Sequence, residues 1–167
     1  LIGEDNAAIL GAFLVTKVQL AAMSRSDIPD VKDRRPFYLY VDEFQNFATE
    51  SFESILSEAR KFRLNLIVAN QFMTQLTDKI REGLLGNVGT IVCGRIGITD
   101  AEIMEKAFTP TFNAEDLHNQ PNYHAISTVM MFDMPSKPFT MKLLPPLVEG
   151  NPEVMDGMKL YSATKYG

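Results

Sequence analysis

YLYVDEFQNFA, residues 38–48, is the stretch that decides the fold of this chain. A short apolar run ends there in two neighbouring carboxylates, Asp42 and Glu43. An apolar run of this length, bounded by polar residues, predicts a buried strand. Because α/β sheets bind ligands beyond the carboxyl ends of their strands, we expect both acids at a ligand-binding edge.

Two adjacent acids at a strand end are typical of the Walker B position of a P-loop nucleoside triphosphatase. One acid helps to hold Mg²⁺ on the nucleotide phosphates, and a second carboxylate can accept the proton of the attacking water. Successive strand residues point to opposite sides, so the two roles can be divided. We assign Mg²⁺ to Asp42 and the water to Glu43. The alternative interpretation is a strand that ends in a solvated Asp-Glu turn.

The residues that follow predict a strand–helix–strand unit. Thr49 is expected to cap a helix whose apolar face recurs at helical spacing, with the residues Phe52, Ile55, Leu56 and Ala59. A second apolar run, residues 64–69, then ends in Asn70 and Gln71. This order predicts a βαβ unit with parallel strands. Gln71, at the tip of the neighbouring strand, is expected to contact the γ-phosphate or its attacking water, as a sensor residue.

Two arginines are candidates for contact with a nucleotide across a subunit interface. Arg60 lies at the edge of the apolar face of the predicted helix. A guanidinium there can stabilise charge on the phosphoryl group of a neighbouring subunit, a role that lysine fills less well. The alternative is a surface cation paired with a nearby carboxylate. Arg95 lies at the end of a third predicted strand, residues 88–96, and could also face a nucleotide across an interface. The alternative interpretation of Arg95 is a salt bridge to Asp100 or Glu102.

Three stretches carry a family resemblance: YLYVDEFQNFA, ILSEARKFRLNLIVANQ and GNVGTIVCGRIGITDAEIMEKAF. They resemble the C-terminal half of the motor domain in the HerA/FtsK superfamily, in particular the TraG/TraD-like coupling proteins and type IV secretion ATPases of conjugation. The resemblance covers about residues 9–146. It implies a RecA-like hexameric ATPase that moves DNA at the cytoplasmic face of the membrane. It also implies Asp42 and Glu43 as the Walker B pair, Gln71 as the sensor and Arg60 as an arginine finger acting on the adjacent subunit.

One motif of that family is not found in this sequence. No G-x-x-x-x-G-K-[ST] occurs, and residues 83–86 have neither its spacing nor its lysine. The chain therefore has no such loop whose backbone N–H groups would cradle the phosphates. We expect the P-loop half, and the membrane anchor, in a preceding part of a longer parent protein. ATP and Mg²⁺ are then cofactors of the parent protein, and this fragment alone is expected to be inactive.

Charge does not by itself indicate nucleic-acid binding. The net charge is −5, and the Lys and Arg residues are scattered apart from clusters at residues 32–35 and 60–63. A DNA-binding surface on a single chain usually shows a basic stripe. DNA is therefore a partner that the resemblance implies, held in a pore built by several subunits. Two alternatives remain open: a secretion ATPase of the same fold that does not act on DNA, and a catalytically inactive protein-interaction module.

The resemblance also sets the expected partners and location. We expect self-association to a hexamer, relaxosome and secretion-channel proteins as partners, and contact with the membrane only through segments outside this chain. The location expected for the parent protein is cytoplasmic, at the inner face of the cell membrane. The single cysteine, Cys93, lies in an apolar run and is predicted to be a small buried hydrophobe in a reducing compartment.

The predicted fold class is α/β, a partial RecA-like P-loop NTPase fold with a mostly parallel sheet flanked by helices. Apolar content of 46% and the absence of a composition shift indicate one domain, residues 1–146, followed by a polar tail, residues 147–167. Residues 6–23 predict a buried helix, because polar residues interrupt this apolar segment and it falls short of the roughly 20 residues that a bilayer core demands. Residues 99–102 predict a capping box. Residues 124–132 and 139–144 predict a C-terminal antiparallel hairpin.

Overall fold

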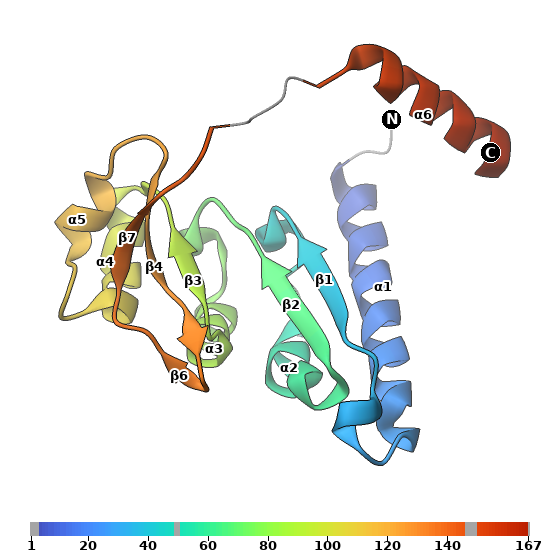
Figure 1. Ribbon diagram of the computed structural model, residues 1–167, viewed down its shortest axis with the longest axis horizontal. Helices are drawn as coiled ribbons and strands as arrows, with labels where there is room; N and C mark the ends of the chain where they lie inside the picture. The colour runs from blue at the N-terminus through green and yellow to red at the C-terminus, as the bar shows by residue number, and fades with distance from the viewer. Residues whose placement is uncertain (1–3, 49–50, 146–149, 167) are drawn as a thin grey trace.

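The computed structural model describes residues 4–48, 51–145 and 150–166, and the described strands form three small sheets (Figure 1). The first sheet is a parallel pair, β1 (Phe37–Val41) with β2 (Leu64–Val68). The second is antiparallel in the order β3-β4-β7, made of β3 (Ile91–Cys93), β4 (His124–Thr128) and β7 (Phe139–Lys142). The third is a small hairpin of β5 (Met130–Met131) and β6 (Met134–Pro135).

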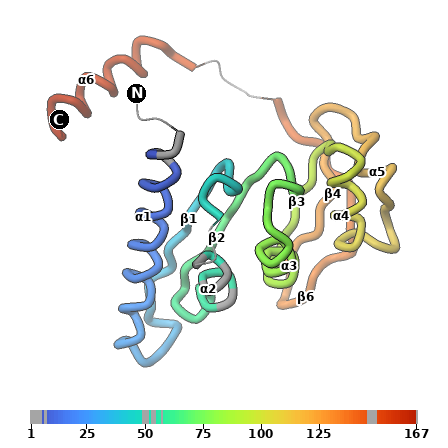
Figure 2. The backbone as a smooth tube through the Cα atoms, turned by 180° about the vertical axis from the view of Figure 1, so that it is seen from behind, coloured from blue at the N-terminus to red at the C-terminus, as the bar shows by residue number. Residues whose placement is uncertain are grey.

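Helices accompany these strands along the whole described chain. The α-helices are α1 (Glu4–Met23), α2 (Ser51–Glu58), α3 (Asp78–Asn87), α4 (Ile98–Phe108), α5 (Ala114–His118) and α6 (Pro152–Tyr166). Short 3₁₀ helices connect them: η1 (Ser24–Asp27), η2 (Val31–Asp33), η3 (Phe44–Asn46), η4 (Ala59–Phe62) and η5 (Met73–Gln75). Seen from behind, α2 and α3 lie in front of the strands and α1 runs beside β1 (Figure 2).

The predicted βαβ unit is present in β1, α2 with η4, and β2. The two strands pair in register from Phe37 opposite Leu64 to Val41 opposite Val68. Phe52, at the start of the predicted apolar face, is 1% exposed, and the rest of that face is buried or half-buried. Thr49, the predicted cap, lies outside the described residues. The alternation of an apolar run, a helical stripe and a second apolar run therefore predicted this part of the fold correctly.

The described strands do not form the one mostly parallel sheet that the sequence predicted. β3 pairs with β4 and not with β2, and it is shorter than the predicted strand, residues 88–96. The expected antiparallel hairpin is present as β4 and β7, with Ser127 opposite Phe139, and the small β5–β6 hairpin lies between them in the sequence. The fold is thus α/β, with the parallel pair and the antiparallel sheet as separate halves.

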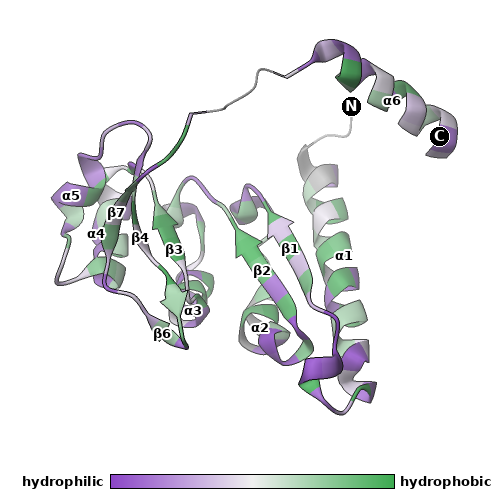
Figure 3. Cartoon of the chain, in the orientation of Figure 1, coloured by the Kyte–Doolittle hydropathy of each residue, from purple (hydrophilic) through white to green (hydrophobic). Residues whose placement is uncertain are grey.

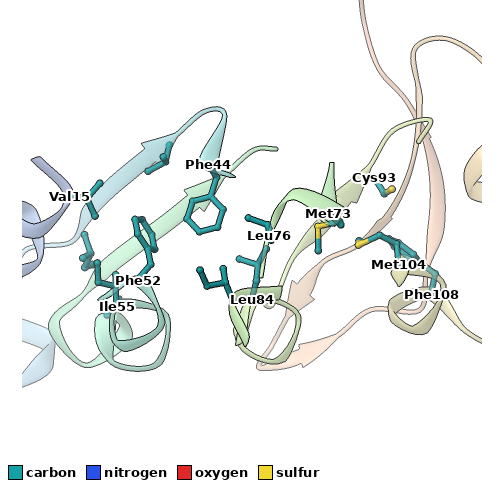
Figure 4. Packing of buried hydrophobic residues seen from close by; sticks show 14 of the residues in the cluster. Val15, Phe44, Phe52, Ile55, Met73, Leu76, Leu84, Cys93, Met104 and Phe108 are labelled. Atoms are coloured by element: carbon teal, nitrogen blue, oxygen red, sulfur yellow. The ribbon is translucent and has the colours of Figure 1, made fainter. Parts of the chain in front are cut away.

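One buried apolar cluster connects the two halves beneath the strands (Figure 4). On the side of β1, Phe44 and Phe52 meet edge to face with ring centroids 4.8 Å apart. Leu84 of α3 and Met73 of η5 continue the cluster toward Phe108 of α4. The helices therefore bridge the two sheets even though the strands of the two sheets do not pair.

Phe52→Ala tests this cluster. Removing a fully buried ring leaves a cavity, so the free energy of unfolding is expected to fall by about 3–5 kcal/mol. Denaturant-induced unfolding measures the change. Phe72→Ala is the matched control because Phe72 is 46% exposed, and a change of less than about 0.5 kcal/mol is expected there. Equal losses in the two variants would contradict the placement of Phe52.

The prediction that residues 6–23 form a buried helix is only half right. α1 is helical, but among its residues whose burial the structure describes only Val15 and Ala22 are buried, whereas Phe13 is 65% exposed and Leu14 is 59% exposed. Hydrophobic residues follow one another along most of the visible length of α1 (Figure 3), and Ile9, Leu10 and Leu20 are exposed as well. Among the described residues, the helical segment Ala8–Asp27 is the one that is long and apolar enough to cross a membrane, and 11% of that segment is buried.

The capping box predicted at residues 99–102 is wrong. α4 begins at Ile98, after Gly97, and Asp100 lies inside the first turn. Asp100 is 4% exposed, and its carboxylate accepts a hydrogen bond from the Thr74 N–H at 3.0 Å. A long-range partner in η5 thus takes the place of the local cap that the sequence suggested.

Arginines of the two basic clusters bind the backbone of this chain. Arg34 is 9% exposed; its guanidinium donates to the Ile28 carbonyl at 2.8 and 3.1 Å and also to the Lys61 carbonyl. Arg63 donates to the Lys32 and Arg34 carbonyls at 2.9 and 3.1 Å. These side chains join the segment before β1 to the segment before β2, so they stabilise the parallel pair.

Arg34→Met tests the structural role of this guanidinium. The substitution keeps an unbranched apolar side chain but leaves two carbonyl groups without their donor, so the free energy of unfolding is expected to fall by about 1–3 kcal/mol. The next residue, Arg35, is exposed and gives the control variant Arg35→Met. Its free energy of unfolding is expected to change by less than about 0.5 kcal/mol. Chemical unfolding of the two variants would show whether the difference exists.

Cys93 is buried as predicted, with 6% exposure. Burial, aided by the negative charge of Asp100, raises the pKa of the thiol to about 11 from an ordinary value of 9.0. The folded state holds this proton more tightly, so the contribution of Cys93 to stability is present below pH 9.0 and is lost as the pH rises toward about 11. At pH 8 a thiol reagent should react about 10²-fold more slowly with the native chain than with the urea-unfolded chain, because the thiolate is the nucleophile. Equal rates would contradict this burial.

The tail, predicted as residues 147–167, contains α6, and residues 147–149 and 167 lie outside the described residues. No described residue of α6 is buried. The helix stands apart from the sheets in both views (Figures 1 and 2).

Candidate functional site

Glu43 occupies an unusual backbone position at the end of β1. Its φ of 47° and ψ of 48° are left-handed, a conformation that is uncommon for residues other than glycine. The residue that follows Glu43 is fixed in place, because Phe44 is fully buried and its N–H donates to the Ala69 carbonyl at 2.9 Å. The buried Phe44 ring therefore holds the Glu43 backbone in this conformation, and backbone strain of this kind is typical of functional sites.

Two amide side chains hold the Glu43 carboxylate. Gln71 Nε2 donates to Glu43 Oε1 at 2.5 Å, and Gln45 Nε2 donates to Glu43 Oε2 at 2.6 Å. Gln71 follows β2 and Gln45 lies in η3, so the contact joins the ends of both parallel strands. The structure therefore brings together Glu43 and Gln71, two residues that the sequence singled out. The half-buried Glu43 carboxylate is held in one orientation with a partner on each oxygen.

Gln45 is a site residue that sequence reasoning missed. Its Oε1 atom is buried and has no hydrogen-bond partner among the described residues. The signal available in the sequence was its position two residues after Glu43, on the same turn. Such a spacing is too common to identify a contact without the backbone geometry of the turn.

Asp42 lies at the same edge and is exposed. Its Oδ1 accepts a hydrogen bond from the Glu43 N–H at 3.0 Å. No group of three or more His, Cys, Asp or Glu residues that could hold a metal ion occurs in the described part of the chain. One exposed carboxylate suits Mg²⁺, which usually takes one or two carboxylates and completes its shell with phosphate oxygens and water. Asp42 fits that donor set, but only in the presence of a nucleotide.

Arg60 lies away from this edge. It belongs to η4, which precedes β2, whereas Gln71 follows β2, so the five residues of the strand separate them. Its guanidinium pairs with Asp133 at 3.5 Å, and both side chains are 91% exposed. The structure therefore does not bring Arg60 to Glu43 within one chain. Its role as an arginine finger on an adjacent subunit stays a prediction.

Arg95 follows β3, whose carboxyl end points the same way as those of β1 and β2 (Figure 1). Its side chain is exposed. Among the described residues, Arg95 forms no salt bridge with Asp100 or Glu102, which were its expected alternative partners. A nucleotide-facing role for Arg95 stays a prediction.

Comparisons with known proteins agree with the family resemblance. Residues 36–107 match the model of the family described as "TraM recognition site of TraD and TraG". This segment contains Asp42, Glu43, Gln45, Gln71 and both candidate arginines. A search of curated protein sequences gives no match.

Two solved structures share the fold at low sequence identity. The bacterial conjugative coupling protein TrwB, as TrwBdeltaN70, has a TM-score of 0.57 and 17% identity, covering 74% of this chain and 34% of that chain. The genome packaging NTPase B204 from Sulfolobus turreted icosahedral virus 2, in complex with ATP-gammaS, has a TM-score of 0.55 and 14% identity, covering 80% of this chain and 62% of that chain. The chain thus spans about a third of the length of the TrwB chain. The family model thus supports the resemblance to TraG/TraD-like proteins over residues 36–107, and the two solved structures support a shared fold.

Proposed function

We propose that this chain is part of an ATP-driven, DNA-translocating motor of the coupling-protein kind, and that it supplies the Walker B pair and the sensor glutamine of the ATP site. The observation that carries the proposal is the hydrogen bond between Gln71 and Glu43, which joins the ends of neighbouring parallel strands. A held carboxylate at this edge is what hydrolysis of a nucleotide requires. The match to the TraD and TraG family model supports the assignment to conjugation.

In this proposal Glu43 accepts the proton of the attacking water. Each carboxylate oxygen has two lone pairs, so Glu43 can hold both amides and still accept a hydrogen bond from water. Gln71 donates to Glu43 through Nε2, and its Oε1 is an acceptor that can orient the same water. Gln45 fixes the second carboxylate oxygen and so keeps the carboxylate in one plane. The two amides are therefore positioning residues for the general base.

Asp42 would hold Mg²⁺ on the bound nucleotide. When bound, Mg²⁺ neutralises charge on the phosphates. The P-loop would come from a segment outside this sequence, since no phosphate-binding motif occurs within it. The complete site then requires the parent protein, which we propose to act as a hexamer at the cytoplasmic face of the membrane. Arg60, and as a second candidate Arg95, would reach the site of the adjacent subunit.

The expected partners of the parent protein follow from the same proposal. They are DNA, relaxosome proteins and components of the secretion channel. The family description names a TraM recognition site, which supports a partner of the TraM kind on the segment 36–107.

A second candidate is a secretion ATPase of the same fold that does not act on DNA. Two observations favour it. The net charge is −5. Arg25, Arg34 and Arg63 bind backbone carbonyls of this chain, so they are not free to form a basic surface.

The two candidates differ in their response to DNA. We expect the ATP turnover of the parent protein to rise when single- or double-stranded DNA is added, with a stimulation that weakens as salt increases. A steady-state assay with and without DNA, at two salt concentrations, measures this. Turnover that is present but unchanged by either form of DNA would favour the second candidate. The absence of any turnover would favour an inactive protein-interaction module.

A further inference from the structure

The β5–β6 hairpin presents an apolar tip to solvent. It consists of the two short strands and the turn Phe132-Asp133 between them. Phe132 is 93% exposed, and its neighbours Met131 and Met134 are exposed as well. Single exposed apolar side chains are normal on a protein surface, whereas several that adjoin one another mark an interaction site.

The turn holds Phe132 in an unfavourable backbone conformation. Both turn residues are left-handed, with φ of 52° at Phe132 and 60° at Asp133. Two-residue hairpin turns of this kind favour Asn-Gly or Asp-Gly, because a bulky side chain is strained at positive φ. Strain persists where the surrounding structure enforces it, and it clusters at functional sites. The phenylalanine ring is thus held in water at a cost to the folded chain.

The base of the hairpin is fixed to the rest of the chain. Thr90 Oγ1 accepts a hydrogen bond from the Met130 N–H at 3.2 Å. The Ser136 N–H donates to the Val129 carbonyl at 2.8 Å, and the Ser136 hydroxyl accepts from the Val129 N–H at 3.0 Å. A Cβ on Gly89 would lie 2.8 Å from the Met130 side chain, so these segments are in close contact. The exposed tip is therefore carried on a preorganised stem, which lowers the cost of binding.

The hairpin lies at the edge formed by the amino ends of β1 and β2, which we call the amino edge (Figure 1). Asp133 Oδ1 is 3.5 Å from Arg60 Nη2, and Arg60 precedes β2. The Gln71–Glu43 contact lies at the opposite, carboxyl edge, and the five residues of β2 between the two edges span about 17 Å. Phe132 is therefore remote from Glu43 of its own chain.

We propose that the β5–β6 hairpin docks on an adjacent copy of this chain, with Phe132 packed on the carboxyl edge of that copy. The inference rests on the proposed function, in which Arg60 of one subunit reaches the ATP site of the next. Because Arg60 and the hairpin share the amino edge, one docking brings both of them to the neighbouring site. Contact between two different edges is heterologous, so its repetition gives a ring where the rotation closes.

The carboxyl edge offers a matching surface. Phe72, which directly follows Gln71, and Ile98, at the start of α4, are both exposed there. Each edge also carries exposed charges of both signs, Arg60 and Asp133 on the amino edge and Asp42 and Arg95 on the carboxyl edge. Opposite charges can therefore face each other around the apolar contact and set its orientation.

A second copy fits the hairpin better than nucleic acid does. Within residues 130–135 the single charged side chain is the acid Asp133, which repels phosphate groups. Methionine side chains, in contrast, adapt to irregular apolar surfaces of proteins. The composition of the hairpin therefore favours a protein surface as its partner.

Phe132→Asn in the parent protein tests the docking. Asparagine tolerates positive φ better than phenylalanine does, so the hairpin should keep its fold while it loses the ring. Loss of an aromatic anchor is expected to raise the concentration of half-maximal self-association by about 10-fold or more. Analytical ultracentrifugation without nucleotide measures this concentration. Unchanged self-association in Phe132→Asn would overturn the inference.

Asp133→Asn is the matched control. It alters the next residue of the same turn, keeps a side chain that tolerates positive φ and removes no apolar surface. Self-association of this variant should stay within about two-fold of wild type, because exposed charges contribute little. The midpoint of thermal unfolding of this chain alone should not fall in either variant. A lower midpoint in Phe132→Asn would make the ring part of the packing of its own chain, which would contradict the inference.

Cysteine pairs give an independent readout of which edges meet. Phe132→Cys combined with Phe72→Cys or with Ile98→Cys should give chains of crosslinked subunits with a short bismaleimide, whereas each single variant should give none above wild type. The native Cys93 is buried and should not react. Crosslinked dimers from Phe132→Cys alone would place two hairpins together and would contradict docking on the carboxyl edge. No crosslinking of either pair would contradict it too.

The outcomes separate this inference from the proposed function. A ring that depends on Phe132 but shows no ATP turnover would refute the proposed function alone. DNA-stimulated turnover together with unchanged self-association in Phe132→Asn would refute the docking alone. If Phe132→Asn weakened DNA binding and left self-association unchanged, nucleic acid would be the partner of the hairpin, and the docking on a second copy would be wrong.

Discussion

Glu43→Gln is expected to lower the ATP turnover of the parent protein by about 10²- to 10⁴-fold while nucleotide binding is retained. Glutamine has nearly the same shape, but its amide group is a far weaker proton acceptor than a carboxylate. It also offers one oxygen where the native residue offers two, so it keeps only one of the hydrogen bonds from Gln71 and Gln45. Single-turnover hydrolysis, together with binding of a fluorescent ATP analogue, separates the chemical step from binding.

Glu58→Gln is the matched control for this result. Glu58 is a half-buried acid of α2 that pairs with Lys61 at 3.8 Å, away from the strand ends. Its substitution changes the charge of the chain equally and should leave turnover within about two-fold of wild type. If Glu43→Gln left turnover unchanged as well, the assignment of Glu43 as general base would be wrong. The interaction-module alternative would then be the better description.

Arg60→Ala is expected to lower turnover by about 10³- to 10⁵-fold if Arg60 acts as an arginine finger on the adjacent subunit. Arg60→Lys should recover little of the loss, because lysine keeps the charge but not the planar fork of donors. Asp133→Asn is the control for the pair seen in this chain: it removes the carboxylate partner and keeps the guanidinium. Because both side chains are 91% exposed, loss of this ion pair alone should have little effect on stability or turnover.

Mixing two inactive variants distinguishes a finger from a surface cation. In a ring, one subunit would supply Glu43 and its neighbour would supply Arg60 to the same site. A 1:1 mixture of Arg60→Ala and Glu43→Gln subunits would then restore about a quarter of the interfaces. Recovery of turnover on mixing is the expected result. If the Arg60→Ala variant alone kept wild-type turnover, the arginine-finger assignment would be wrong. The exposed ion pair with Asp133 would then be the role that remains for Arg60.

Local sequence patterns predicted the βαβ unit, the burial of Cys93 and the C-terminal antiparallel pairing. In each case a short pattern carries the information: an apolar run for a strand, a helical stripe for a packed face, and strand formers on both sides of a turn. The proximity of Glu43 and Gln71 was predictable too, because neighbouring parallel strands end at the same edge of a sheet.

Long-range competition explains the features that were predicted wrongly. The sequence placed Asp100 in a local capping box, but its carboxylate accepts a hydrogen bond from the Thr74 N–H of η5 instead. α1 resembled a buried helix because it is apolar, yet burial depends on what packs against each face, and Leu14 remains 59% exposed. The separate parallel and antiparallel halves depend on the partner that each strand edge finds, which an apolar run does not specify.

The sequence by itself determined the order of strands and helices, the position of the Asp42–Glu43 pair at a strand end, and the family to which these motifs point. These features depend on residues that are close together in the chain. Tertiary structure alone decided that Gln45 joins Gln71 on the Glu43 carboxylate, that Arg60 lies at the far end of β2, and that the two sheets do not pair with each other. Each of these outcomes depends on contacts between distant segments. Their geometry follows from packing and from backbone hydrogen bonds that local patterns do not encode.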